Sequence, residues 1–353
     1  MESASRVDET TVGNRRVALL LDAAAEAAEG RAAEEDLDAI QQALRSLRYE
    51  PVTVEYAGDP KAFLEALMIG DFGIVFNLCE GLSRLAAGEH LPAAAIELLG
   101  IPITGARSLT LGLCVQKDRT NALLHGHGVA VPEWTVASTS GAESGWEMFP
   151  AILKPVGEDG SEGIHSHSVV RDRTELAAVL SQGSRDWDRM LVQRFIAGRE
   201  FNLAIVAGEV LPHAEIDFSG LPDDLPPVVT HAAKWKPDSP EYRGTVARCP
   251  AAIPDAVAVR LTALAERVWR LVDGRGYGRV DVRVDRSGEP FVIDVNPNPD
   301  LSPGAGLARQ AAAAGWQYEQ LIDRILADAV ASVDPPARQR HERWQRRMYE
   351  MPT

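Results

Sequence analysis

Arg279-Val-Asp-Val-Arg-Val-Asp285, then Arg-Ser-Gly-Glu, then Pro290-Phe-Val-Ile-Asp-Val-Asn296, is the stretch of this sequence that predicts a β-hairpin with charged residues on one face. Counting back along both strands from a four-residue turn at 286–289 places Asp281 opposite Asp294 and Arg279 opposite Asn296. The same alternation predicts that Val280, Val282 and Val284 of the first strand share one face. In the second strand it predicts that Phe291, Ile293 and Val295 share one face, with Val292, Asp294 and Asn296 on the other.

The two opposed carboxylates of this hairpin predict a cation site. Cβ atoms of directly opposed residues lie about 4.5–5.5 Å apart, and like charges at that spacing destabilise a sheet unless something lies between them. Mg²⁺ prefers oxygen ligands and is usually held by one or two carboxylates together with nucleotide phosphates. Asp281, Asp294 and the amide oxygen of Asn296 fit this chemistry. The alternative is a solvated hairpin, because a one-residue shift in register would separate the carboxylates.

Composition sets the broad class of the protein. A chain of 353 residues, 45% hydrophobic and 25% charged, is long enough for two or three domains. The net charge of -15 disfavours nucleic acid and membrane surfaces as partners. Neither a signal pattern nor an apolar run of roughly 20 residues is found, which predicts a cytoplasmic protein. Three widely spaced cysteines without a Cys-x-x-Cys pair predict buried, reduced thiols.

The first hundred residues alternate strand-like and helix-like segments, which predicts a parallel sheet built from βαβ units. The predicted strands are 16–21, 51–56, 72–78 and 101–104, and the predicted helices are 34–47, 60–69 and 92–99. A longer helix is predicted over 109–126 and another over 255–272, the latter with an apolar stripe.

A second feature points to phosphate binding. The predicted strand 150–154 ends in Lys154, and the loop that follows contains Gly157, Gly160, Ser161 and Gly163. Glycines allow backbone N–H groups to approach phosphate oxygens closely, and the lysine adds a point charge beside them. The alternative is a flexible surface loop with a solvated lysine. A P-loop is absent, and the Gly-x-Gly-x-Gly run 274–278 precedes a strand, whereas a dinucleotide fingerprint would open a helix.

In their order along the chain, these segments resemble the ATP-grasp superfamily and, within it, the D-alanine–D-alanine ligase group. The resemblance covers nearly everything from Arg16 to about Val330. The matching stretches are Val75-Phe-Asn-Leu78, Gly100-Ile-Pro-Ile-Thr-Gly105, Lys117, Pro150-Ala-Ile-Leu-Lys-Pro155, Val192-Gln-Arg-Phe-Ile196, Gly198-Arg-Glu200, Lys234, Gly278-Arg-Val-Asp-Val282 and Asp294-Val-Asn296.

The resemblance implies a mixed α/β and α+β architecture in which two domains clamp ATP between their sheets. The implied domains are an N-terminal α/β domain at 16–107, a small central domain at 108–196 and a C-terminal catalytic domain at 197–332. An arginine-bearing tail at 333–353 follows, for which a solvated segment is the simplest interpretation. Dimers are common in the family, which implies a homodimer.

The resemblance also implies roles for individual residues. The implied nucleotide contacts are Lys117 and Lys154 on the phosphates, Gly160 and Ser161 in a covering loop, Gln193 with Arg194, Phe195 and Ile196 at the adenine edge, and Glu200 on the ribose. Lys234 matches a lysine near the transferring phosphate. Asp281, Asp294 and Asn296 match the ligands of Mg²⁺, for which Mn²⁺ is a substitute, and Asp294 is shorter than the usual glutamate.

The implied chemistry is an ADP-forming carboxylate–amine ligation through an acyl phosphate. Arg279 projects on the same face as Asp281 and is suitably placed to stabilise the oxyanion of the second step. The alternative interpretation is that Arg279 neutralises Asp281 or Asp294.

Substrate recognition departs from the cell-wall ligases. The segment Asp22-Ala-Ala-Ala-Glu26 lacks the family's glycine-rich turn, and Gly160 and Trp235 replace its coupled serine and tyrosine. Downstream, Asp300, Gly304 and Ala305 replace a glycine, a histidine and a serine. The expected substrate contacts are Glu80, Trp235, Asp300 and Ser302. A helix-capping role is the alternative for Glu80.

These departures favour a ligase that joins amino acids or small peptide-like acids and amines in specialised metabolism. The segment 231–248 is expected to form a lid over the site. Two alternatives stay open: a D-alanine–D-alanine ligase of cell-wall synthesis, and a non-catalytic module that binds nucleotide.

Overall fold

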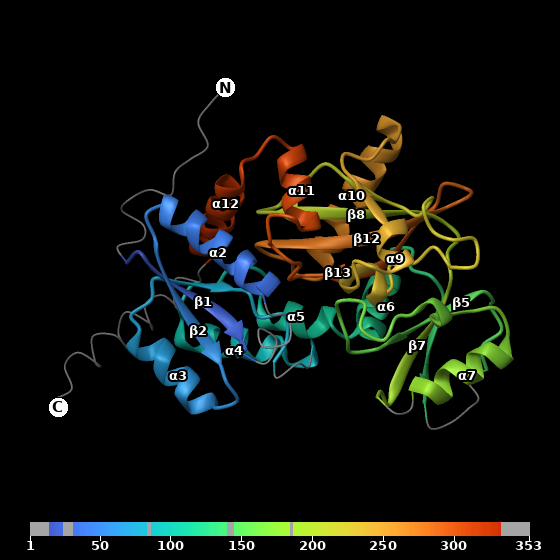
Figure 1. Cartoon of the computed structure of the whole chain (residues 1–353), viewed down its shortest axis with the longest axis horizontal. Coiled ribbons are helices and arrows are strands. Elements are labelled where there is room, and N and C mark those ends of the chain that lie inside the picture. Colours follow the sequence, from blue (N-terminus) through green and yellow to red (C-terminus); the bar gives the residue numbers. More distant parts are fainter. Residues whose placement is uncertain (1–13, 24–30, 83–85, 140–144, 184–185, 333–353) are drawn as a thin grey trace.

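The computed structural model describes residues 14–23, 31–82, 86–139, 145–183 and 186–332, which form three sheets flanked by helices (Figure 1). The first sheet is parallel, in the order β2-β1-β3, as the βαβ pattern predicted. Its strands are β1 (Arg16–Asp22), β2 (Glu50–Tyr56) and β3 (Ile74–Asn77). The helices around it are α2 (Arg31–Ser46), α3 (Pro60–Ile69) and α4 (His90–Leu99), and η1 (Ala86–Gly88) is a short 3-10 turn.

Two predictions for this region are wrong in detail. The predicted strand 101–104 is reduced to a single parallel bridge between Ile103 and Val75. The predicted helix 109–126 is two helices, α5 (Ser108–Cys114) and α6 (Lys117–Gly126). The break has a tertiary cause, because the Lys117 amide donates to the carbonyl of Val156 at 3.1 Å, outside the helix. This contact fixes Lys117 at the first position of α6.

The second sheet is antiparallel, in the order β4-β7-β5-β6, and one helix covers one of its faces. Met190 and Val192 point to that helix, so alternation turns Gln193 to the opposite face. Lys154 and Ile152 share this opposite face, since both line the same pocket as Gln193. The elements are β4 (Trp134–Ser138), β5 (Ala151–Pro155), η2 (Ser166–Ser168), β6 (Val169–Val170), α7 (Arg173–Gly183) and β7 (Arg189–Arg194).

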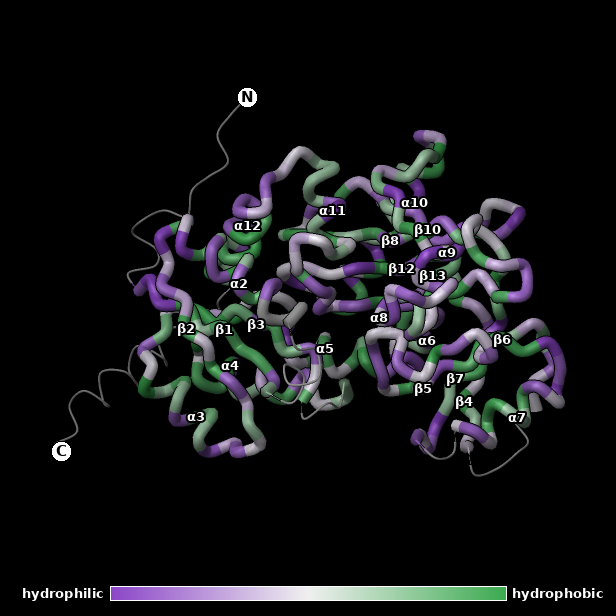
Figure 2. The backbone as a smooth tube through the Cα atoms, in the orientation of Figure 1, coloured by the Kyte–Doolittle hydropathy of each residue, from purple (hydrophilic) through white to green (hydrophobic). Residues whose placement is uncertain are grey.

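The third sheet follows the order β11-β10-β8-β12-β13, with β9 paired to β8. One face packs on α10, and the predicted apolar stripe of that helix is buried at Leu261 and Val268. Figure 2 shows hydrophobic residues along β1 and β8, on either side of the core shared by the first and third sheets. The elements are β8 (Gly198–Val206), β9 (Glu209–Val210), β10 (Ala214–Asp217), α8 (His231–Trp235), α9 (Pro240–Gly244), β11 (Val246–Arg248), α10 (Asp255–Leu271), β12 (Tyr277–Asp285), β13 (Pro290–Asn296), α11 (Gly306–Ala313) and α12 (Tyr318–Ala331).

The β12–β13 hairpin confirms the predicted pairs Asp281↔Asp294 and Arg279↔Asn296. The predicted turn is wrong by one residue, because Val284 pairs with Pro290 and the Asp285 amide donates to the carbonyl of Glu289. An irregularity beyond Asp281 restores the register.

The same irregularity changes the predicted faces of β13. Val292 is buried in the core opposite Val282, whereas Ile293 lines a pocket beside Asp294. The predicted assignment of Val292 and Ile293 to their faces is therefore wrong. The physical reason is that one extra residue in a strand reverses the alternation on one side of the bulge.

The glycine run at 274–278 serves packing. Gly276 has φ +65, and a Cβ there would lie 2.6 Å from the Cα of Gly105. Its amide donates to Asp328 at 3.0 Å. The start of β12 can therefore approach the loop of Gly105 only with glycine at this position.

In the described parts of the chain, no helix is long and apolar enough to cross a membrane.

Replacing Gly276 by alanine is expected to destabilise the protein by more than the same change at Gly288. Both glycines have positive φ, but a Cβ at Gly288 would meet nothing within 4 Å. Backbone strain costs about 1–3 kcal/mol, and only Gly276→Ala adds a clash with backbone. Urea denaturation of both variants measures the difference in unfolding free energy, and equal losses would contradict the packing argument.

Candidate functional site

A pocket of about 820 Å³ lies between the polar faces of the second and third sheets. β5 and β7 form one wall, and β8, β12 and β13 form the other. Every site residue expected from the sequence lines it: Glu80, Lys117, Lys154, Gly160, Ser161, Gln193, Arg194, Phe195, Ile196, Glu200, Lys234, Trp235, Arg279, Asp281, Asp294, Asn296, Asp300 and Ser302.

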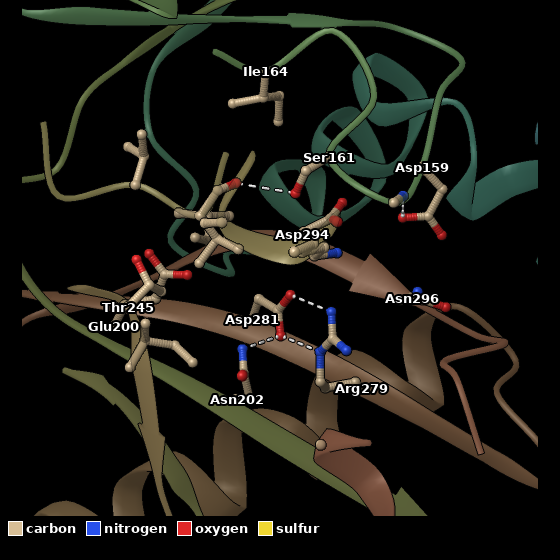
Figure 3. Close-up of a pocket in the computed structure, with 18 of the residues that line it drawn as sticks. Asp159, Ser161, Ile164, Glu200, Asn202, Thr245, Arg279, Asp281, Asp294 and Asn296 are labelled. Atoms are coloured by element: carbon tan, nitrogen blue, oxygen red, sulfur yellow. Dashed lines mark hydrogen bonds and ion pairs between the residues drawn. The ribbon is translucent and has the colours of Figure 1, made fainter. Parts of the chain in front are cut away.

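The centre of the pocket is the carboxylate pair of the hairpin (Figure 3). Arg279 binds Asp281 through two hydrogen bonds, Nε to Oδ1 at 2.7 Å and Nη2 to Oδ2 at 3.0 Å. Asn202 on β8 donates to the same Oδ1 at 2.7 Å. The interpretation that Arg279 neutralises Asp281 therefore describes this structure. Burial opposes the charge of Arg279, but Asp281 and its acidic neighbours outweigh burial and raise the pKa of Arg279.

Asp294 lies opposite Asp281 on the paired strand, and Arg279 makes its two hydrogen bonds to Asp281. Burial raises the pKa of Asp294, and repulsion from Asp159 and Asp281 acts in the same direction. Lys117 and Lys154 oppose this shift. A carboxylate whose ionised form is disfavoured in this way gains from a nearby cation.

The donor set fits a hard divalent cation. Two carboxylates and the Asn296 amide occur on neighbouring positions of two paired strands, and all three line the pocket. The Asn296 Oδ1 accepts from the Asn298 amide at 2.8 Å, which fixes the orientation of the Asn296 side chain. No group of three His, Cys, Asp or Glu suited to a metal occurs among the described residues, so an amide ligand would be needed here.

Two of the three lysines that line the pocket, Lys117 and Lys154, are fixed by backbone carbonyls. Lys154 is 7% exposed and donates from Nζ to the carbonyl of Ile293 at 3.1 Å. Burial lowers the pKa of Lys154, and Asp294 partly offsets this effect. Lys117 Nζ contacts the carbonyl of Glu158 in the glycine loop. Both ammonium groups thus lie between the two sheets, where phosphate groups can reach them.

The glycine loop and the predicted lid contact one another over the pocket. Ser161 Oγ donates to the carbonyl of Val229 at 3.0 Å. Trp235 Nε1 donates to the carbonyl of Gly160 at 3.1 Å, so the two positions that depart from the family pattern are direct neighbours. The lid segment comprises α8, α9 and β11, and it brings Lys234 to the pocket.

The inner end of the pocket suits a nucleobase. Gln193 is 1% exposed, and its Nε2 has no hydrogen-bond partner among the described residues. Ile152, which pairs with Gln193, also lines the pocket, as do Ile196 and Ile216. An apolar slot with an unsatisfied amide is the environment that a purine can complete. Arg194 directs its side chain to the Glu133 carboxylate, and its backbone amide donates to the carbonyl of Glu133 at 2.9 Å.

Glu200 belongs to a buried ion pair that the sequence did not predict. Arg283 Nε donates to Glu200 Oε2 at 2.9 Å, and both side chains are less than a tenth exposed. The guanidinium also donates to the carbonyl of Ile196 at 2.9 Å and lies 4.7 Å from the ring centroid of Phe195. Arg283 thereby fixes the segment of Phe195 and Ile196, where contacts to the nucleotide are expected.

The opposite end of the pocket holds the expected substrate residues. Asp300 accepts hydrogen bonds from the Ser302 amide at 2.7 Å and from its hydroxyl at 2.9 Å. A Cβ at Gly304 would meet nothing within 4 Å, so this end is open. Glu80 lies in the turn after β3 and directly precedes none of the described helices, which contradicts the capping alternative. Of the segment at 22–26, the last three residues lie outside the described residues.

Among the further lining residues that sequence reasoning missed, Asn202 and Asp159 are polar and lie near the expected site residues in the chain. Asn202 alternates with Glu200 on β8, so the period of two could have found it. Asp159 is an acidic residue inside a predicted phosphate loop, which is itself a signal. Burial would raise the pKa of Asp159, but three cations, with Lys117 the strongest, and the hydrogen bond from the Gly160 amide together lower it.

Comparison with known proteins places these features in a family. Residues 124–327 match the family model described as D-ala D-ala ligase C-terminus. The chain is 32% identical over 299 residues to the uncharacterized protein y4sG of Sinorhizobium fredii, covering 82% of this chain and 85% of that protein. It is 30% identical over 285 residues to a D-alanine--D-alanine ligase of Chromohalobacter salexigens, covering 79% and 83%.

Solved structures show the same fold. A D-alanine--D-alanine ligase from Bacillus anthracis, complexed with ATP, superposes with a TM-score of 0.72 at 20% identity, covering 93% of this chain and 99% of that one. VanG D-Ala:D-Ser ligase from Enterococcus faecalis superposes with a TM-score of 0.69 at 19% identity, covering 90% and 99%.

Replacing Arg283 by methionine is expected to cost about 3–5 kcal/mol of unfolding free energy, because it leaves the buried Glu200 charge unpaired. Arg260 pairs with Glu289 at 3.2 Å on the surface and provides the control, since Arg260→Met should cost at most about 1 kcal/mol. Chemical denaturation measures both changes. Similar losses would show that the Arg283 pair is not the anchor described above.

Proposed function

Since the chain belongs to the D-alanine–D-alanine ligase family, whose members are ATP-dependent and ADP-forming, we propose that it joins the carboxylate of one amino acid or small peptide-like molecule to the amine of another. One observation carries this proposal. A paired carboxylate site, three lysines and Arg279 converge in one pocket between two sheets. This charge pattern suits magnesium-bound triphosphate at one end and an acid that receives the phosphate at the other.

The reaction has two steps. The acid's carboxylate oxygen attacks the γ-phosphorus of ATP, which breaks the bond to ADP and forms an acyl phosphate. The amine then attacks the acyl carbon, loses a proton, and expels inorganic phosphate to leave the amide. Lys117, Lys154 and Lys234 offset phosphate charge in the first step, and Arg279 stabilises the oxyanion of the second. Mg²⁺, when bound, supplies further charge neutralisation at the phosphates.

The proposed substrates differ from two D-alanines. Asp300 holds its carboxylate at the end of the pocket where cell-wall ligases present a glycine, and a negative charge there disfavours a second free carboxylate nearby. The open space at Gly304 leaves room for a larger acceptor. These features support a different acid–amine pair, and specialised metabolism is the proposed context. D-alanine with D-alanine is the second candidate, because named relatives carry that activity.

A matrix of amino acids, small carboxylic acids and amines, assayed for ADP release with mass detection of the product, tests the proposal. We expect one pair to give stoichiometric ADP and amide. ADP release with D-alanine alone would support the cell-wall alternative. Nucleotide binding without turnover for any pair would support the non-catalytic module instead.

Asp294→Asn is expected to have opposite effects on stability and turnover. Removing one of two opposed charges should raise the melting temperature without magnesium, because the repulsion with Asp281 and Asp159 is lost. Loss of a metal ligand should lower magnesium-dependent ADP formation by on the order of 10²-fold or more. The melting temperature and the rate are measured on the same preparation.

Asp273→Asn, outside the pocket, is the matched control and should change neither quantity appreciably. Asp273 has φ +53, a conformation that asparagine also tolerates. An Asp294→Asn variant that kept full magnesium-dependent turnover would contradict the metal-site assignment.

A further inference from the structure

Asp159 is a carboxylate in the part of the pocket where the proposed function expects phosphate. It lies in the middle of the glycine loop, between β5 and β6, beside Ser161 (Figure 3). Its Oδ1 accepts a hydrogen bond from the Gly160 amide at 2.7 Å. That amide belongs to the loop whose N–H groups are the expected phosphate donors. The carboxylate therefore uses one of these donors in the absence of nucleotide.

Three cations from three separate elements line the same pocket as this carboxylate. Lys117 begins α6, Lys234 lies in α8, and Arg279 lies in β12. Burial alone would raise the pKa of Asp159, but these three charges and the hydrogen bond from the Gly160 amide together outweigh burial and lower it. The adjacent carbonyl of Glu158 contacts Lys117 Nζ as well. Two consecutive loop residues, Glu158 and Asp159, thus interact with Lys117, the lysine that the family resemblance assigns to phosphate.

Converging cations in a desolvated pocket repel one another unless an anion lies among them. We propose that Asp159 is an internal anion that takes the place of an ATP phosphate in the nucleotide-free protein, so that nucleotide binding exchanges one anion for the other. This inference rests on the proposed function for the positions of the phosphates. In this inference Asp159 is a positioning residue. It sets nucleotide affinity by competing with a phosphate for the cations, and it neutralises these cations again when product leaves.

The exchange would also relieve an electrostatic repulsion between Asp159 and Asp294. Asp159 and Asp294, the expected metal ligand, line the same pocket, so the like charges of the internal anion and the metal ligand repel each other. Displacement of Asp159 by a phosphate that brings its own magnesium would relieve this repulsion. The carboxylate is therefore suited to an exchange and poorly suited to permanent residence beside Asp294.

Calorimetric titration with a non-hydrolysable ATP analogue, with and without Mg²⁺, tests the inference without any acid or amine. Asp159→Asn keeps an oxygen acceptor for the Gly160 amide but removes the competing charge. We expect the Kd to fall by about tenfold in both conditions. Glu162→Gln removes the same charge from the same loop at a carboxylate that lies 3.4 Å from His231 Nε2, and should change the Kd less than about twofold.

The outcomes separate this inference from the proposed function. An unchanged or higher Kd in both conditions would overturn it. Tighter binding without Mg²⁺ but weaker binding with Mg²⁺ would also overturn it, since Asp159 would then be a metal ligand. A wild-type protein that binds no nucleotide would overturn the proposed function together with the inference. Asp159→Ser provides a second neutral variant if the asparagine variant does not fold, and the same fall in Kd is expected.

Discussion

Charge balance in a desolvated pocket constrains most of this structure. Asp281 and Asp294 are held opposite each other by strand pairing, where their repulsion is largest. Arg279 binds one of them with two hydrogen bonds, and lysines from the other wall offset the second. Because the third sheet carries the carboxylates while β5 and α6 carry the lysines, the pocket is close to neutral only when both walls face each other. The arrangement of the sheets and the chemistry of the site therefore depend on the same interaction.

The covering segments add a second layer to this arrangement. A hydrogen bond from Trp235 joins the lid segment to the glycine loop, and the His231 amide donates to the carbonyl of Ile164 at 2.9 Å. Ser161 donates to the carbonyl of Val229, just before the lid segment. Each of these three bonds uses a backbone carbonyl as acceptor, so the contact depends little on the side chains of the partner positions. A tryptophan can thus replace the family's tyrosine at this junction.

Local sequence patterns predicted most elements, and their failures have tertiary causes. The hairpin was found from alternation, and its central pairs are correct even though the turn is one residue shorter, because a bulge in β13 compensates. That bulge could not be predicted from periodicity, and it moves Val292 into the core and Ile293 to the pocket. The division of the helix at 109–126 follows from a hydrogen bond between Lys117 and Val156, which are far apart in the sequence.

The sequence by itself identified a set of candidate site residues, and the structure brings all of these candidates to one pocket. Alternation and loop composition are local properties, and they suffice to find opposed carboxylates, a glycine loop and a terminal lysine. Only the tertiary structure decided how these groups are paired. The Arg283–Glu200 ion pair, the Trp235–Gly160 hydrogen bond and the position of Asp159 among three cations depend on elements far apart in the chain, where desolvation and distance set the strength of each interaction.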